Sequence, residues 1–176
     1  FDGLLFDIID PSGSEEKIIQ GQRLDALTPA DGRYGRDTEI LRPYFSERAL
    51  IRYRVIMETE YLIALMETLA QSDDKIAKAG NARELTQEEI TFMRELSNRL
   101  PAEIVQDIET KGYDGIPRTG HDVAACAEAI KREMSQHPTL KDLARFVHLG
   151  TTSEDTTSCA HAMMLHRDCD PVPCPG

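Results

Sequence analysis

The sequence predicts an all-α protein, and three observations lead to that prediction. Apolar residues recur at three- and four-residue spacing over several long stretches. Residues that favour helix N-caps precede these stretches, and proline or glycine follows them. No stretch shows the alternation of apolar and polar residues that a half-buried strand needs. With 176 residues, 40% of them apolar, the chain is long enough to bury one sizeable core.

The first part of the chain is expected to be irregular. Residues 1–22 combine a short apolar run, a Pro-Ser-Gly-Ser break and a charged stretch, so we interpret them as an N-terminal extension that is poorly ordered or packed on a neighbour. The following run from Leu24 to Tyr44 is rich in turn formers and has no long helical pattern. It is typical of a loop with functional potential.

Two helical stretches should follow. The first begins after Ser46, a good N-cap, and runs to Gln71. The second opens at Thr86, which has the spacing of a capping box with Glu89, and Pro101 should kink or divide it. The apolar residues that define the first stretch are Leu50, Ile51, Val55, Tyr61, Leu62, Leu65 and Leu69.

The second half of the chain continues the helical pattern. Glycine and proline predict a loop over residues 111–120, and a helix should run from Asp122 to Met134, with His137-Pro138 ending it. Thr139 with Asp142 resembles a further cap, opening a short helix to His148. A last helix, capped by Thr152 or Ser153, should reach about residue 166.

Charge and cysteine content narrow the class of protein. A formal charge of −11 and a pI near 4.9 argue against a nucleic-acid or anionic-membrane binder, because such partners need a basic face. No run approaches the ~20 apolar residues that span a bilayer, and no signal peptide is recognisable. Four cysteines are too few for a secreted disulfide scaffold, so a soluble, cytoplasmic protein is expected. Cys126 and Cys159 should be small core residues on helices.

Three junctions between loops and helices carry polar residues that core packing does not require. At the first, a turn places Arg33 beside Tyr34, and the arginine fork suits phosphate or carboxylate oxygens. At the second, His121 lies at a helix N-terminus, which attracts anions, and Asp122 follows it. The simpler alternatives are an exposed, salt-bridging arginine at the first junction, and an exposed histidine with a first-turn acid at the second.

The third junction is His148-Leu149-Gly150-Thr151-Thr152-Ser153-Glu154-Asp155, where a helix ends at glycine and three hydroxyl residues begin the next one. Unpaired backbone N–H groups together with hydroxyls make a cradle for a carboxylate. A purely local alternative is a cluster of good N-cap residues.

Taken in this order, the three junctions resemble adenylosuccinate lyases of the fumarase/aspartase superfamily. The segments are LDALTPADGRYGRDTEILRPYFSERALIRYRVIMETEYLIALMETL, TGHDVAACAEAIKREM and FVHLGTTSEDTTSCAHAMML, and the resemblance covers about residues 23–167. It implies an N-terminal helical domain of the L-aspartase-like fold over 23–150. The start of a central helical domain would follow over 151–167, with an irregular tail over 168–176.

The resemblance implies roles for residues at all three junctions. Arg33 and Tyr34 would hold the nucleotide end of the substrate, with Arg33 on phosphate, and Thr152 and Ser153 would bind succinyl carboxylates. The substrates would be adenylosuccinate and SAICAR, and the reaction a β-elimination of fumarate that gives AMP and AICAR. A homotetramer is implied, with no cofactor and no metal.

At the second junction, His121 and Asp122 match a substrate-contacting pair, with His121 assisting catalysis. Gly120 stands where the family usually has a larger polar residue, so one substrate contact is altered there. The sequence ends before the segments that supply the family's acid histidine and basic serine loop. The isolated chain is therefore expected to be inactive. Prolines in the tail, Pro171, Pro173 and Pro175, prevent the long helix with which the family continues.

Three alternatives stay open. Another lyase of the superfamily, such as argininosuccinate lyase or fumarase, shares the HLGTTSED segment. A zinc module in the tail could use His161, His166, Cys169 and Cys174, although their spacing matches no usual paired arrangement. A non-catalytic helical fragment that joins intact lyase subunits is the third, because a domain without its bundle would expose apolar surface.

Overall fold

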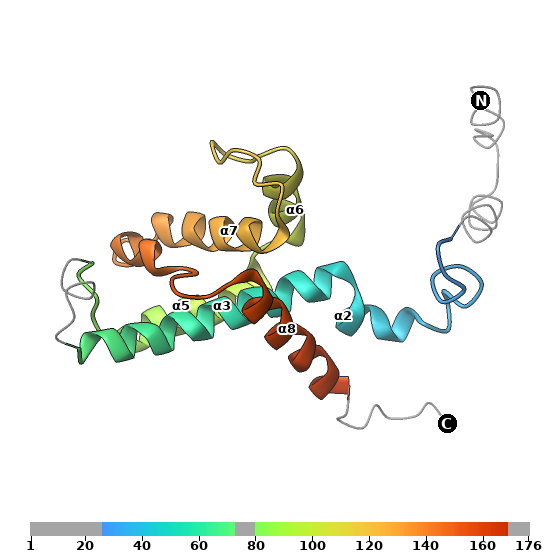
Figure 1. Cartoon of the computed structure of the whole chain (residues 1–176), viewed down its shortest axis with the longest axis horizontal. Coiled ribbons are helices and arrows are strands. Elements are labelled where there is room, and N and C mark those ends of the chain that lie inside the picture. The colour runs from blue at the N-terminus through green and yellow to red at the C-terminus, as the bar shows by residue number, and fades with distance from the viewer. Residues whose placement is uncertain (1–25, 73–79, 169–176) are drawn as a thin grey trace. The chain divides into compact units, whose positions relative to one another are not determined.

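The fold of the described residues is helical, which confirms the predicted all-α class. The structure, a computed structural model, describes residues 26–72 and 80–168 (Figure 1). These residues form no strand and a single isolated bridge, between Tyr113 and Ile116. The described residues fall into two compact units, one up to residue 43 and the other from residue 44 onward. The predicted extension over 1–22 lies outside the described residues, and so does the predicted irregular tail over 168–176 apart from residue 168, which is the last residue of a helix.

Successive turns make up the described part of the first unit, up to residue 38. The Thr38 hydroxyl donates to the carbonyl oxygens of Ala30 at 2.7 Å and Tyr34 at 3.1 Å, which ties the turns together. A 3-10 helix, η1 (Glu39–Leu41), and a short helix, α2 (Arg42–Phe45), follow. The predicted loop over 24–44 therefore ends earlier than expected, because pieces of three or four residues are too short to show a helical period.

The helices predicted from capping residues begin at those residues. In α3 (Glu47–Ala70) the Ser46 hydroxyl accepts from the Ala49 N–H at 3.2 Å. In α5 (Gln87–Arg99) Thr86 and Glu89 form both bonds of a capping box. Pro101 divides the stretch as predicted, and α6 (Ala102–Thr110) follows it.

Three further elements complete the second unit. Helix α7 (Asp122–Gln136) ends at His137 as predicted, and α8 (Ser153–Asp168) begins at the hydroxyl run. Between them lies a 3-10 helix, η2 (Lys141–Phe146), which ends before His148. The prediction that Thr139 caps this element is wrong. Its hydroxyl donates to the Glu89 carboxylate instead, and that bond competes with a local cap.

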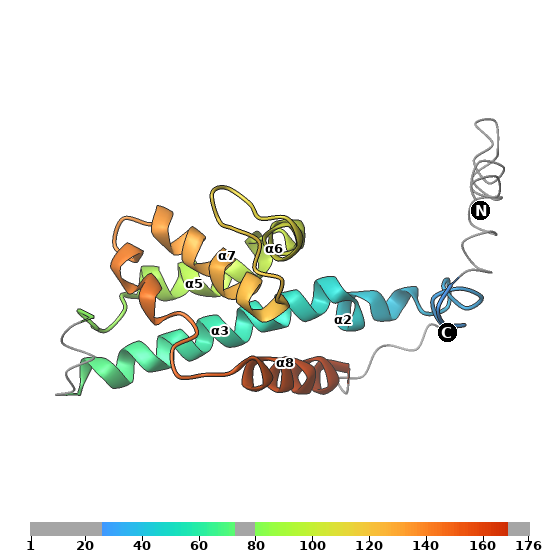
Figure 2. The ribbon, with the colours of Figure 1, turned by 45° about the horizontal axis from the view of Figure 1, so that its top comes forward.

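Helix α3 is the centre of the second unit. Figure 2 shows α5, α6 and α7 on one side of it and α8 on the other. No described helix is long and apolar enough to cross a bilayer. The main core lies among α3, α5, α7 and η2 and includes Leu62, Met66, Met93, Leu96, Ile130, Met134 and Phe146. A second cluster joins α6 and α7 to α3, and a third joins α3 to α8 through Ala49, Tyr53, Ala160 and Met164.

The two described cysteines differ in environment. Cys126 is buried in the core, as predicted, and burial raises the pKa of its thiol to about 12. Cys159 is exposed, so the prediction of a core position is wrong for it. Helix α8 packs on α3 through Ala160 and Met164, which turns the neighbouring Cys159 toward solvent.

Candidate functional site

The N-terminus of α7 presents His121 at the surface. His121 is the N-cap residue, and its Nδ1 lies 3.5 Å from the backbone nitrogen of Ala124. Gly120, just before it, has a φ of +63°, a left-handed conformation that glycine adopts without strain. A Cβ at Gly120 would meet nothing within 4 Å, so space allows a larger residue there while the backbone disfavours one.

The N-terminus of α8 carries the hydroxyl run. Asp155 accepts from the backbone N–H of Thr152 at 2.8 Å and from its hydroxyl at 3.0 Å. These two bonds keep the pKa of Asp155 below its usual range. Thr152 thus donates to Asp155 and stands just outside the helix, and Ser153 is the first helical residue.

These two helix starts meet. The Oγ of Ser153 lies 3.2 Å from the Nε2 of His121, although 32 residues separate them in the sequence. About half of the His121 side chain is exposed, and Thr152 is exposed beside it. Two helix N-termini therefore face solvent at one place. Each combines the partial positive charge of its first backbone N–H groups with hydrogen-bonding side chains, so this place suits an anionic group.

Asp122 links this surface to a buried arginine. Its Oδ2 lies 2.6 Å from Nη2 of Arg54, and its Oδ1 accepts from the Val123 N–H at 2.8 Å and faces His121 Nδ1 at 3.2 Å. Burial raises the pKa of Asp122, but the Val123 bond and the Arg54 charge outweigh it, so the pKa lies below its ordinary value. Asp122 is therefore a carboxylate at neutral pH.

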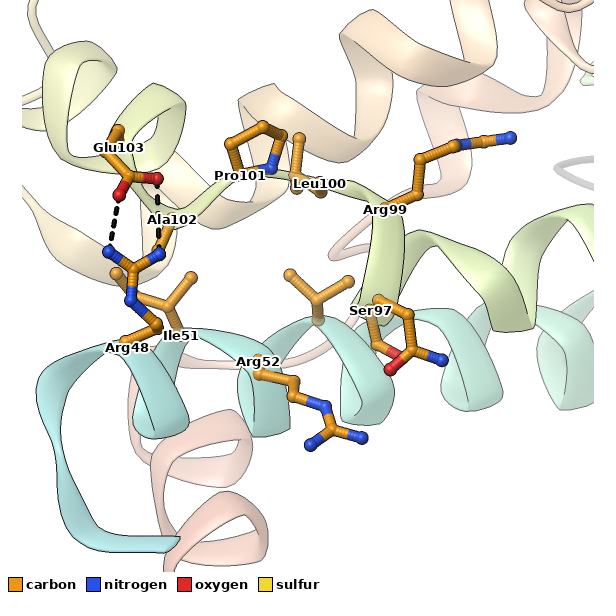
Figure 3. A pocket seen from close by; sticks show the side chains of 11 residues that line it. Arg48, Ile51, Arg52, Ser97, Arg99, Leu100, Pro101, Ala102 and Glu103 are labelled. Carbon is orange, nitrogen blue, oxygen red and sulfur yellow. Dashed lines mark hydrogen bonds and ion pairs between the residues drawn. The ribbon is translucent and has the colours of Figure 1, made fainter. Parts of the chain in front are cut away.

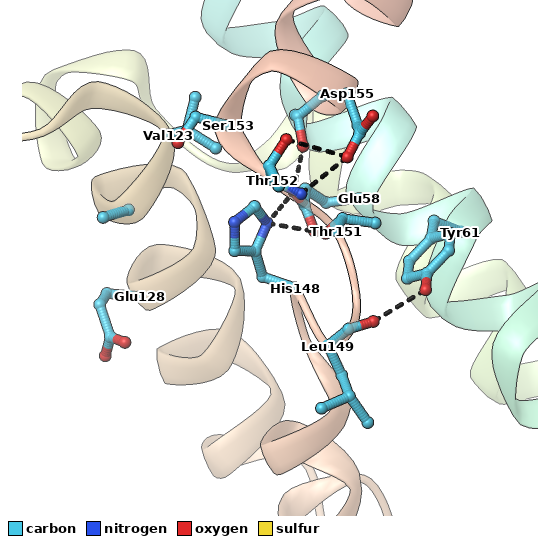
Figure 4. Close-up of polar contacts among 12 residues, drawn as sticks. Glu58, Tyr61, Val123, Glu128, His148, Leu149, Thr151, Thr152, Ser153 and Asp155 are labelled. Carbon is cyan, nitrogen blue, oxygen red and sulfur yellow. Dashed lines mark hydrogen bonds and ion pairs between the residues drawn. The ribbon is translucent and has the colours of Figure 1, made fainter.

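A buried acid, Glu58, holds the HLGTTSED loop. Glu58 is 1% exposed, and its Oε1 lies 2.7 Å from His148 Nδ1 and accepts from the Thr156 hydroxyl at 2.7 Å. His148 has a φ of +63°, and its Nδ1 also lies 3.2 Å from the Thr151 hydroxyl. Figure 4 shows these groups together, with the Tyr61 hydroxyl donating to the Leu149 carbonyl at 2.8 Å. The ring of His148 is thereby fixed between α3 and the start of α8.

Three of these residues, Arg54, Glu58 and His148, were not predicted as site residues. Arg54 and Glu58 lie four residues apart on α3, among the apolar residues that define its buried face. Charged residues on such a face are a signal, since Arg and Glu are seldom fully buried unless paired. That signal was present in the sequence and was missed.

Arg33 and Tyr34 belong to the first unit. The Arg33 guanidinium carbon lies 5.6 Å from the centre of the Tyr34 ring, and Tyr34 is 47% exposed. The pair thus presents a cation and a phenol side by side, as the sequence predicts. Because the two units are described separately, convergence of Arg33 with His121 and Ser153 stays a prediction.

Hollows on the second unit include two lined by α3 and α6, one of which reaches Asp122 of the candidate site. One of about 460 Å³, in Figure 3, lies between α3 and the α5–α6 junction and is crossed by the Arg48–Glu103 ion pair. The other, about 520 Å³, is lined by Glu47, Glu103, Glu109 and Asp122 as well as Arg48. Its excess of carboxylates makes it unsuitable for a polyanion.

A zinc module in the tail is one of the alternative predictions. Within residues 26–72 and 80–168, no three His, Cys, Asp or Glu residues are grouped so that they could hold a metal ion. Cys169 and Cys174, which complete the zinc set with His161 and His166, lie outside the described residues.

Comparison with known proteins gives one consistent result. Adenylosuccinate lyase of Legionella pneumophila (strain Corby) is 33% identical over 145 residues, which make up 81% of this chain and 28% of the relative. The Vibrio cholerae enzyme is 32% identical over 152 residues, 85% of this chain and 30% of the relative. Adenylosuccinate lyase of Escherichia coli (strain K12) is 32% identical over 149 residues, with the same coverage. No protein-family model matches the chain.

These relatives define the class of protein as a lyase. The chain is similar to adenylosuccinate lyases over more than four fifths of its length, which confirms the resemblance found in its three motifs. It spans about 30% of the length of the curated relatives that it matches.

Proposed function

We propose that this chain is the N-terminal part of an adenylosuccinate lyase, a carbon–nitrogen lyase that acts on adenylosuccinate and SAICAR. In the reaction a base removes a proton from the carbon next to a carboxylate, the C–N bond breaks as the C=C bond forms, and an acid protonates the departing nitrogen. The products are fumarate with AMP or AICAR. In this proposal residues 23–150 form the N-terminal domain and residues 151–167 begin the central one.

The observation that carries the proposal is the contact between His121 Nε2 and Ser153 Oγ. It joins two of the three family-like motifs at adjoining helix N-termini, where an anionic substrate is favoured. His121 would assist proton transfer. Ser153 would donate to the succinyl carboxylates, and Thr152 would do so once its hydroxyl leaves Asp155. Such fixed donors stabilise the negative charge that develops when the proton is removed.

The remaining roles follow from the family resemblance. Arg33 would bind the phosphate and Tyr34 would lie against the nucleotide, and Asp122 would contact substrate beside His121. Gly120 would leave one family contact unmade, since it has no side chain. Neither a cofactor nor a metal has a role in this chemistry, and the active enzyme would be a homotetramer in the cytoplasm.

The test uses the complete protein encoded with this chain. Fumarate release is measured with adenylosuccinate, SAICAR, argininosuccinate and malate as substrates, and turnover of the first two alone is expected. His121→Ala should lower kcat by about 10² to 10⁴ and Ser153→Ala by about 10². His161→Gln, an exposed histidine change on α8, should leave kcat unchanged.

Two outcomes would overturn the proposal. Turnover of argininosuccinate or malate in place of adenylosuccinate would assign the chain to another lyase of the superfamily. Absence of any fumarate release by the complete protein would favour a non-catalytic helical fragment. The 176-residue chain by itself is expected to release no fumarate, and measurable release by it would contradict the proposed need for further segments.

A further inference from the structure

Arg54 is a buried charged residue at the junction of three helices. It lies on α3, is 4% exposed, and has Nη2 2.6 Å from Asp122 on α7 and 3.4 Å from the Thr157 hydroxyl on α8. Its Nη1 lies 3.9 Å from Glu47. Within the described residues, Nε and Nη1 have no hydrogen-bond partner. Burying a guanidinium in this way is costly, and a well-packed apolar residue is often as stable. Stability alone therefore does not account for an arginine here.

The Asp122 carboxylate has each oxygen committed to a different partner. Oδ2 pairs with Arg54, and Oδ1 accepts from Val123 N–H and faces the Nδ1 of His121. With both oxygens engaged, the plane of the carboxylate cannot rotate without breaking a bond. The contact of Arg54 Nη2 with Oδ2 thus determines where Oδ1 lies relative to the His121 ring.

The two nitrogens of the His121 ring face different residues. Nδ1 lies 3.2 Å from Asp122 Oδ1, and Nε2 lies 3.2 Å from Ser153 Oγ. Four side chains therefore connect in series, from buried Arg54 through Asp122 and His121 to Ser153. A displacement of Asp122 would be passed to the ring atom that faces Ser153.

We propose that Arg54 is a positioning residue of the candidate site, which holds Asp122 so that the His121 ring is directed at Ser153. The proposal rests on the proposed function for the role of His121. Arg54 is buried behind Asp122, so it acts on the site through its neighbours. Loss of Arg54 should disturb the orientation of His121 more than the folding of α3.

The first test measures the histidine rings in the 176-residue chain by long-range ¹H–¹⁵N NMR. Arg54→Met should move the ring nitrogen resonances of His121 by more than their linewidth and leave those of His137 and His161 in place. Arg54→Lys keeps the charge without the fork and should give a smaller shift. Arg94→Met is the matched control, because Arg94 makes an exposed, bidentate pair with Glu60 that is remote from His121.

A double-variant comparison shows whether the effect passes through Asp122. In an Asp122→Asn background, Arg54→Lys should add no further shift to His121. Additive shifts would overturn the proposal, as would unchanged His121 resonances in a folded Arg54→Met chain. If Arg54→Met does not fold, the His121 shifts caused by Arg54→Lys, measured with and without Asp122→Asn, decide whether Arg54 positions His121.

Turnover by the complete protein separates this proposal from the proposed function. Arg54→Lys should lower kcat about 10- to 100-fold with little change in KM, because a small misplacement of a catalytic group is costly. Normal kcat in Arg54→Lys would overturn the positioning role while the lyase function stands. The opposite outcome is also possible. If Arg54→Met shifts the His121 resonances but the unaltered complete protein releases no fumarate, the positioning role stands and the lyase function is refuted.

Discussion

At the scale of single residues, Glu58 shows how a buried charge organises a loop. The residue is 1% exposed, and its Oε1 contacts both the Nδ1 of His148 and the hydroxyl of Thr156. Removing the carboxylate leaves two hydrogen-bonding groups without their acceptor in the interior, and that loss costs more than the net value of the bonds.

Glu58→Leu is therefore expected to lower the free energy of unfolding by about 2 to 4 kcal/mol. Urea denaturation followed by circular dichroism measures this. The matched control is Glu60→Gln, two residues away, where an exposed pair with Arg94 should contribute little to stability because solvent screens it. Equal losses in the two variants would contradict the role assigned to Glu58.

Residue-level predictions succeeded where local rules decide the structure. Ser46, Thr86 and His137 mark helix ends in the sequence and in the structure, because capping depends on neighbours within four residues. The prediction for Thr139 failed because a partner 50 residues away, Glu89, takes its hydroxyl. Likewise, the acceptor for His148 is 90 residues distant, which no local pattern reveals.

At the scale of elements, the capping box of α5 is extended into a tertiary contact. Arg83 donates to both oxygens of Glu89 at 2.8 and 2.6 Å, and to the Thr139 carbonyl at 3.0 Å. The Arg83 bonds hold the pKa of Glu89 at about 2 against the opposing effect of burial, with help from Thr139 and Thr86. The start of α5 is thereby connected to the residues that follow α7.

This arrangement predicts how stability depends on pH. Because the Glu89 pKa is lowered from 4.5 to about 2, its contribution is complete above pH 4.5 and is lost as the pH falls to about 2. Glu89→Gln should lose on the order of 3 kcal/mol at pH 7 and show a flatter stability curve over that range.

Thermal unfolding between pH 2 and 7 measures the dependence on Glu89. Glu103→Gln is the control, since Glu103 also has a pKa of about 2 but makes its pair with Arg48 in solvent, where screening weakens it. A stability curve for Glu89→Gln that parallels that of the unaltered chain would contradict the assignment.

The arrangement of elements could be predicted only in part. The helices, the break at Pro101 and the class of fold follow from periodicity and capping. The sides of α3 on which the others pack do not, because the buried residues of α3 lie around much of its surface, with Tyr53 toward α8 and Leu62 toward α5 and α7. The contact between α7 and α8 at His121 and Ser153 depends on that packing.

At the scale of the whole molecule, the second unit leaves apolar side chains at its surface. Leu165 is 62% exposed, Phe45 41% and Leu149 40%. The chain spans about 30% of the length of its relatives, and the proposed enzyme is a tetramer. Exposed apolar groups of this kind favour association of copies.

The 176-residue chain is therefore expected to associate as its concentration rises. Sedimentation equilibrium should show an average mass that increases with concentration above the 19.7 kDa of one chain. Leu165→Gln should reduce that increase, and His161→Gln on the same helix should not. A compact monomer at high concentration would contradict the prediction.

The backbone and the side chain of His148 make opposing contributions to stability. Among the described residues outside glycine, His148 shares a positive φ with Asn81 and Asp114 alone, and asparagine and aspartate tolerate that region better than most residues. Glycine at 148 would relax the chain at a gain on the order of 1 kcal/mol, yet it would delete the imidazole that Glu58 anchors. The buried Glu58 carboxylate would then lose this partner at a larger cost, so a laboratory screen for heat tolerance should retain the histidine despite its backbone.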